Sequence, residues 1–132
     1  MSKRSESKLA VHTKAIELAK YSINACHNEK IFPKRSRRAL AERIINSVVI
    51  IHNNVYKANN TYVVTKDDAE YRLALQKEAI REINELPPTI ELAYHLYNIN
   101  GRKVDYWVGL ILEEQELLKK WHKSDKERFK KI

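Results

Sequence analysis

Glycine, proline and cysteine are scarce in this sequence of 132 residues, which contains 2 Gly, 3 Pro and 1 Cys. Folds built from many short strands need turn residues every few positions, so this scarcity excludes a turn-dense β-sandwich or barrel. The single cysteine, Cys26, cannot form an intramolecular disulfide, which fits a reducing compartment. We expect Cys26 to be a small residue of the core.

Long apolar runs are missing as well. The longest, residues 48–51, is far shorter than the roughly 20 residues that span a bilayer. Residues 1–6 are polar and lead into amphipathic sequence, which is unlike the apolar core of a signal peptide. We therefore expect a cytoplasmic protein that has no membrane partner.

Apolar residues make up 43% of the chain and recur at spacings of three and four, a pattern that predicts amphipathic helices. The predicted helices cover about residues 7–26, 36–59, 66–97 and, just beyond Gly101, residues up to Ser124. Ser36 is the expected cap of the second helix, and Thr65 with Asp68 predicts a capping box for the third. Asn100 and Gly101 predict a stop, with Gly101 in the left-handed conformation.

The pair Pro87-Pro88 interrupts the third pattern, so the sequence allows two helices or one kinked helix. No Gly, Asn or Ser accompanies the prolines as in a usual loop, and we favour the kink. Four long helices with short connections predict an all-α fold, an antiparallel up-down four-helix bundle whose third helix is kinked. We expect residues 1–132 to form a single domain, frayed at residues 1–6 and 125–132.

The charge is positive and unevenly distributed. Lys and Arg number 25 against 17 Asp and Glu, a net charge of +8 that favours polyanionic partners. Residues 1–43 carry +7, residues 44–118 carry −4 and residues 119–132 carry +5. We expect the linker after the first helix to lie at the same end of the bundle as the last helix's C-terminus, so that both basic blocks form one surface.

The densest cationic cluster follows Pro33 and lies at a helix start, where the helix dipole disfavours positive charge. An anionic partner explains such an arrangement, and Arg side chains bind phosphate oxygens in a bidentate manner. A solvated basic loop is the alternative. The candidate nucleic-acid-binding residues are Lys34, Arg35, Arg37, Arg38, Arg43, Lys119, Lys120 and Lys123.

Aromatic residues add little to this prediction. Trp121 lies among the cations of the last block, but it continues an apolar stripe, and we expect it in the core rather than stacked on a base. We expect five tyrosines to pack against the bundle with their hydroxyls in water. These are Tyr56, Tyr62, Tyr94, Tyr97 and Tyr106.

No pattern typical of catalysis is found. The five histidines never occur three or four residues apart, and one Cys cannot form a thiolate cluster, so we expect no metal site and no cofactor. Glu113, Glu114 and Glu116 are expected to be helix-surface carboxylates that are not paired as acid and base. We therefore expect a protein that is not an enzyme. A small enzyme that uses Glu113 or His122 in a cleft is a remaining alternative.

The basic linker of residues 33–38 leads into a helix that runs from Leu40-Ala41-Glu42-Arg43-Ile44 to Val55-Tyr56-Lys57-Ala58-Asn59. With the Trp-containing last helix, this layout resembles the bacterial four-helix bundle protein family over about residues 9–121. That family includes ribosomal RNA intervening-sequence proteins and the accessory variability determinant proteins of diversity-generating retroelements. The resemblance leaves open which of these two groups this chain is closer to.

The resemblance to the retroelement group implies a basic, pentameric ring that binds a reverse transcriptase and template RNA. The leading hypothesis is a non-catalytic accessory protein whose Lys and Arg side chains hold RNA or an RNA–DNA hybrid while the polymerase supplies the chemistry. The broad apolar face of the second helix is then expected to form subunit contacts in a homo-oligomer. The rival hypothesis is a protein-interaction scaffold of the ribosomal intervening-sequence type.

Overall fold

The computed structural model describes residues 3–132, including the side chains of residues 9–35 and 39–132. This part of the chain consists of four long helices and contains no strand, which confirms the all-α prediction. The helices are α1 (Lys3–His27), α2 (Glu42–Asn59), α3 (Lys66–Tyr97) and α4 (Gly101–Arg128). None of these helices is long and apolar enough to cross a membrane.

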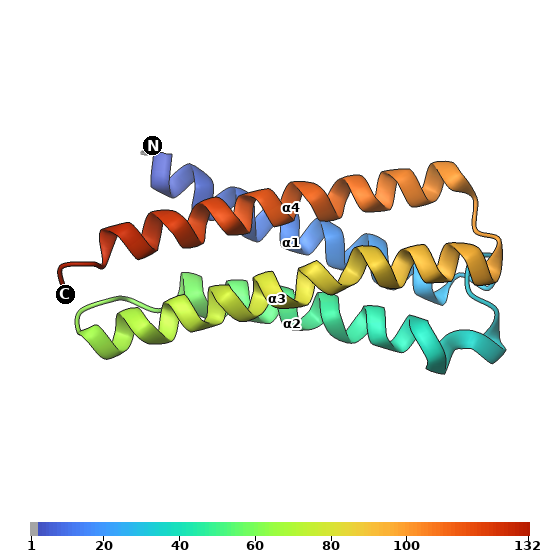
Figure 1. Ribbon diagram of the computed structural model, residues 1–132, viewed down its shortest axis with the longest axis horizontal. Helices are drawn as coiled ribbons and strands as arrows, with labels where there is room; N and C mark the ends of the chain where they lie inside the picture. Colours follow the sequence, from blue (N-terminus) through green and yellow to red (C-terminus); the bar gives the residue numbers. More distant parts are fainter. Residues whose placement is uncertain (1–2) are drawn as a thin grey trace.

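Consecutive helices run in opposite directions, and α4 packs against both α1 and α3 (Figure 1). The linker, residues 28–41, and the turn between α3 and α4 therefore lie at one end of the bundle, here called the linker end. The opposite end, called the terminal end, holds the loop between α2 and α3 and the C-terminus of α4 (Figure 1). The predicted up-down four-helix bundle is the observed architecture.

The expectation that the two basic blocks meet at one end is wrong. Three helices separate the linker from the C-terminus, and an odd number of antiparallel crossings ends on the opposite side of the bundle. Lys34 and Arg35 lie at the linker end, whereas Lys119, Lys120 and Lys123 lie on the half of α4 toward the terminal end (Figure 1). The molecule thus has two basic ends instead of one.

The core follows the predicted apolar stripes. Leu18, Ile51, Ile83 and Ile111, one from each helix, are fully buried. Removing such side chains from water stabilises a fold by about 1.5–3 kcal/mol each. Trp121 is 3% exposed, which confirms its expected place in the core.

Cys26 is buried in the same core and is not part of a disulfide, as predicted. Removal of the thiol from water disfavours the thiolate and raises the pKa of Cys26 to about 12. Since the thiolate is the nucleophilic form, Cys26 is an unreactive packing residue.

The capping box of α3 is present as predicted. The backbone N–H of Asp68 donates to Thr65 Oγ1 at 3.2 Å, and the backbone N–H of Thr65 donates to Asp68 Oδ2 at 3.0 Å. Backbone N–H donors from Thr65 and Val64 stabilise the carboxylate and lower the pKa of Asp68.

The turn between α3 and α4 differs from the prediction. Asn98, with a φ of 53°, is the left-handed residue that follows α3, whereas Gly101 is the first residue of α4. Asn100 caps α4, because its Oδ1 accepts hydrogen bonds from the backbone N–H groups of Arg102 at 2.9 Å and Lys103 at 3.4 Å. Asparagine can serve both purposes because its short polar side chain tolerates left-handed backbone and also accepts N–H bonds.

Helix α3 continues through Pro87 and Pro88, which confirms the prediction of one helix instead of two. Neither proline has an N–H group, so the carbonyls of Ile83 and Asn84 lack their usual partners four residues later. The hydroxyl of Thr89 donates to the carbonyl of Glu85 at 2.9 Å, a back-bond that often accompanies a helix bend.

Three predicted helix boundaries are wrong. Helix α2 begins at Glu42, because a 3₁₀ turn (Lys34–Ser36) and a π-helical turn (Arg37–Ala41) precede it in place of a cap at Ser36. Helix α1 begins at Lys3, so residues 3–6 are helical, and residues 1–2 lie outside the described part. Helix α4 continues to Arg128, and Asp125, which was expected in a frayed tail, is 2% exposed.

Candidate nucleic-acid interface

The linker is held firmly against the start of α4. Phe32 is fully buried, and its ring centre lies 5.6 Å from that of Tyr97 and 6.2 Å from that of Trp107. Backbone N–H groups of Ile31 and Phe32 both donate to the carbonyl of Asn28, at 2.9 and 2.8 Å. The residues that follow Phe32 therefore lie at the same end of the bundle as the N-terminus of α4.

The linker end therefore carries two pairs of cations that are distant in the sequence. Lys34 and Arg35 are exposed in the linker, and Arg102 and Lys103 are exposed in the first turn of α4, which contains no acidic residue. We call these four residues the linker-end surface. Sequence reasoning missed Arg102 and Lys103 because they lie in the block with net negative charge.

The remaining candidates of the linker lie close in sequence to this surface. Arg43 is exposed in the first turn of α2. Arg37 and Arg38 belong to the π-helical turn, and their side chains lie outside the described residues. Lys34 Nζ lies 3.6 Å from Glu29 Oε1, but both side chains are mostly exposed, and such pairs contribute little to stability.

The helix dipole makes the position of Arg102 and Lys103 unfavourable. The first-turn N–H groups of a helix carry partial positive charge, so cations beside them cost free energy and anions beside them gain it. The Asn100 cap offsets two of these N–H groups without adding a negative charge. A bound anion would remove the repulsion, which is the electrostatic reason to regard this surface as a phosphate site.

The second group of candidates lies on the C-terminal half of α4. Lys119, Lys120, Lys123 and Lys126 are exposed, and we call them the terminal-end surface. Lys119, Lys123 and Lys126 are spaced four and three residues apart, so they share one face of the helix. Lys120 Nζ lies 3.8 Å from Glu116 Oε1, whereas the other three have no ion-pair partner among the described side chains.

A buried polar network compensates the charge of Asp125, which lies between Lys123 and Lys126 in the sequence. Arg72 Nε donates to Asp125 Oδ2 at 2.7 Å, and Gln76 Nε2 donates to the same oxygen at 2.6 Å. Arg128 donates to Asp125 Oδ1 at 3.0 Å. Arg72 also donates to the carbonyl of Thr61 at 3.3 Å, so the network ties α4 to α3 and to the loop between α2 and α3. The Asp125 carboxylate is therefore neutralised internally.

Tyr62 lies in that loop at the terminal end and is 86% exposed. The expectation that it packs against the bundle is wrong, because the loop of residues 60–65 directs the chain away from helical packing. An exposed aromatic ring can stack on an unpaired base.

Glu113 and His122, the candidates of the enzyme alternative, contact separate partners. Glu113 Oε2 lies 2.7 Å from Lys14 Nζ, and the bonds of Lys14 to Glu113 and Glu17 raise the pKa of Lys14. His122 Nδ1 lies 3.1 Å from Gln76 Oε1, and burial, together with Lys126 and Lys77, lowers the pKa of His122. Among the described residues, no group of three or more His, Cys, Asp or Glu could hold a metal ion.

Glu114 is not the surface carboxylate that was predicted. It is fully buried, and neither carboxylate oxygen has a hydrogen-bond partner. Burial raises the pKa of Glu114 to about 9, and the nearby Lys14 charge opposes this shift only in part. At neutral pH the side chain is therefore an uncharged acid within the core.

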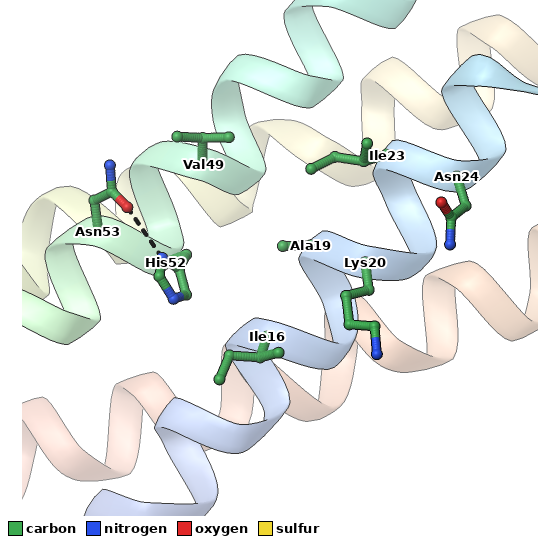
Figure 2. A pocket seen from close by; sticks show the side chains of 8 residues that line it. All are labelled: Ile16, Ala19, Lys20, Ile23, Asn24, Val49, His52 and Asn53. Carbon is green, nitrogen blue, oxygen red and sulfur yellow. Dashed lines mark hydrogen bonds between the residues drawn. The ribbon is translucent and has the colours of Figure 1, made fainter.

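The outer side of α1 and α2, called the α1/α2 face, has a different character. Residues 44–56 include no Asp, Glu, Lys or Arg. A shallow groove of about 450 Å³ lies between the helices, with Lys20 as its single charged lining residue, and Figure 2 shows the side chains that line it. Its lining residues are Ile16, Ala19, Lys20, Ile23, Asn24, Val49, His52 and Asn53.

Comparisons with known proteins leave the family resemblance a prediction. No protein-family model, no curated protein and no solved structure matches this chain. The functional argument therefore depends on the chain's own charges, burial and packing.

Proposed function

We propose that this protein is a non-catalytic nucleic-acid-binding protein whose exposed Lys and Arg side chains contact phosphates. The observation that carries the proposal is the linker-end surface: Lys34 and Arg35 are exposed at the same end of the bundle as Arg102 and Lys103, which lie at a helix N-terminus. Stability alone does not favour cations at that position. A polyanion supplies the compensating charge, and the net charge of +8 increases the rate of its association.

The chemistry of this surface suits phosphate groups rather than base edges. Arg guanidinium groups form paired hydrogen bonds with phosphate oxygens, while Lys acts as a mobile point charge. Such contacts provide affinity and position the nucleic acid, but they carry no sequence information. We therefore expect the protein to bind nucleic acids of many different sequences, with an affinity that falls steeply as the salt concentration rises.

The finer role follows from the family resemblance. We propose that the protein serves a diversity-generating retroelement as the accessory partner of its reverse transcriptase and holds template RNA or an RNA–DNA hybrid. In this proposal several copies form a ring, and the α1/α2 face provides the subunit contacts. The uncharged stretch of residues 44–56 supports that assignment, since like charges on two basic copies repel least where charge is absent.

The test compares wild type with a variant in which Lys34, Arg35, Arg37 and Arg38 are all changed to Gln. Binding of RNA and of RNA–DNA hybrid is measured across a salt series, after circular dichroism has confirmed equal helix content. Log affinity decreases linearly as log salt concentration rises. We expect this slope to be shallower in the variant, by about 1 for each lost phosphate contact.

The matched control removes the same charge elsewhere, by changing Lys57 and Arg81 to Glu, which also lowers the net charge by 4 in total. These residues are exposed and lie outside both basic surfaces. We expect the salt slope of the control variant to differ from that of wild type by less than the change that one lost phosphate contact produces. Equal loss in both variants would mean that net charge, and not a linker site, accounts for binding, and absent binding by wild type would refute the proposal.

A protein-interaction scaffold is the second candidate, and the α1/α2 face is the observation that favours it. Its groove is apolar and partly exposed, since Ile16 is 38% and Val49 is 39% exposed. A protein that docks there leaves both basic surfaces free. Excess RNA is then expected to leave such a partner bound, whereas a partner of the basic surfaces is displaced.

A further inference from the structure

The two basic surfaces are too far apart to act as one binding site. Helix α4 contributes to both, and Lys103 and Lys119 are separated by 16 positions along it. At about 1.5 Å of rise per residue, their backbones lie about 24 Å apart. Since charges in physiological salt are screened over about 8 Å, an anion at one surface does not neutralise the other.

Carboxylates interrupt the surface between the two sets of cations. On the outer sides of α3 and α4, the central positions include the exposed carboxylates Glu78, Glu85, Glu113 and Glu116 beside the exposed cations Lys77 and Arg81. On the α1/α2 face, Lys20 is the single charged residue of the groove. A phosphate backbone laid along the bundle would meet carboxylates on one side and apolar side chains on the other.

Each surface has its own structural support. Burial of Phe32 against Tyr97 and Trp107 anchors the linker to the end of α3 and to α4. At the other end, Asp125 joins α4 to Arg72 and Gln76 of α3. The two sets of cations are therefore fixed at opposite ends of a rigid helical core.

From this arrangement we propose that each chain binds two separate segments of nucleic acid, one at the linker-end surface and one at the terminal-end surface. The proposal rests on the proposed function, because it requires that the chain binds nucleic acid. It goes beyond that function in assigning two phosphate sites to a single chain. The protein then brings together two segments of a template, or a template and its copy.

The test counts the bound molecules of a short ligand per chain. The ligand is an RNA hairpin with a stem of six base pairs. Base pairs of A-form RNA rise by less than the value of about 3.4 Å in B-form DNA, so the stem is shorter than about 20 Å and does not cover both surfaces. Titration calorimetry and native mass spectrometry at low salt give the number bound per chain, which does not depend on how many chains assemble.

Two variants each remove one site. In the first, Lys34, Arg35, Arg102 and Lys103 are changed to Gln, and in the second, Lys119, Lys120, Lys123 and Lys126 are changed to Gln. All eight side chains are exposed, and the variant with Lys57 and Arg81 changed to Glu serves as the control with equal charge loss. We expect two hairpins per chain for wild type and control, and one for each end variant.

The other outcomes separate the two proposals. One hairpin per wild-type chain, or two per chain in either end variant, overturns the assignment of two sites while nucleic-acid binding stands. No hairpin bound by wild type overturns the proposed function and the two-site proposal together. If one end variant loses all binding and the other keeps the binding of wild type, the chain has a single site, and the two-site proposal is also overturned.

Discussion

The fully buried carboxyl of Glu114 shows how residue type and position can conflict. Ile111 and Leu118, which precede and follow it at helical spacing, are also fully buried. The periodicity of α4 therefore indicated a core position for Glu114. The prediction of a surface position was wrong because it followed the polar chemistry of glutamate instead of this periodicity. Asp125, spaced seven residues from Leu118, repeats this conflict, and there Arg72 supplies the compensating charge.

The Glu114→Leu variant tests the cost of this burial. An exposed glutamate, with a pKa of 4.5, is ionised at pH 7, whereas burial raises the pKa of Glu114 to about 9 in the folded state. Keeping the proton on the folded protein at pH 7 then costs about 3 kcal/mol. We expect Glu114→Leu to raise the free energy of unfolding at pH 7 by about that amount, measured by urea denaturation.

The pH dependence gives the sign of the effect. Between pH 4.5 and 9 the folded state holds a proton that the unfolded state releases, so this group lowers stability as pH rises. The gain from Glu114→Leu is therefore expected to shrink as pH falls from 7 toward 4.5. Glu116→Leu, at an exposed position, is the control, and a gain that does not change with pH would contradict the buried-acid explanation.

At the scale of elements, helix identity was predictable and several helix ends were not. The capping box at Thr65 and Asp68 was correctly recognised because both partners are local in sequence. The start of α2 depends on the linker, where burial of Phe32 between α3 and α4 accompanies 3₁₀ and π turns in place of a simple cap. Such boundaries depend on tertiary packing and are therefore not visible in local propensity.

Helix α3 offers a prediction about Pro88. The proline removes the hydrogen bond to the carbonyl of Asn84, and a proline inside a helix costs about 3 kcal/mol. Pro88→Ala restores the donor, and greater freedom of the unfolded chain offsets part of the gain. We expect the free energy of unfolding to rise by about 2 kcal/mol, measured by denaturant titration.

Pro33→Ala is the comparison for this experiment. Pro33 lies in the linker, outside the four long helices, so its replacement restores no bond within a helix. It is expected to lower stability by less than about 1 kcal/mol through the unfolded state. If Pro88→Ala is no more stable than Pro33→Ala, the missing hydrogen bond at Pro88 does not destabilise α3, and the prediction is wrong.

At the scale of the whole molecule, the two ends are basic, whereas the groove of the α1/α2 face has Lys20 as its single charged lining residue. If that face joins subunits, a charge placed within it must separate them. Val49 is 39% exposed and lines the groove shown in Figure 2. We expect Val49→Lys to lower the sedimentation mass from that of an oligomer to that of one chain, with helix content unchanged.

Leu112→Lys is the matched variant, because Leu112 is an exposed apolar residue of α4, outside the α1/α2 face. It is expected to keep the oligomeric mass. A wild-type mass equal to one subunit at working concentrations would refute the ring, and dissociation by Leu112→Lys alone would place the subunit contact on another face.

The sequence by itself determined the helical class, the antiparallel bundle, the buried Cys26 and Trp121, and the continuous α3, because helical periodicity and scarce turn residues are local properties. The relative positions of the basic blocks followed only from the tertiary structure. Lys34 and Lys103 lie at the same end of the bundle because two antiparallel helices separate the linker from α4, while the lysines near the C-terminus lie at the opposite end after three antiparallel crossings. Proximity of residues far apart in the chain depends on how the helices pack, and net charge contains no information about that packing.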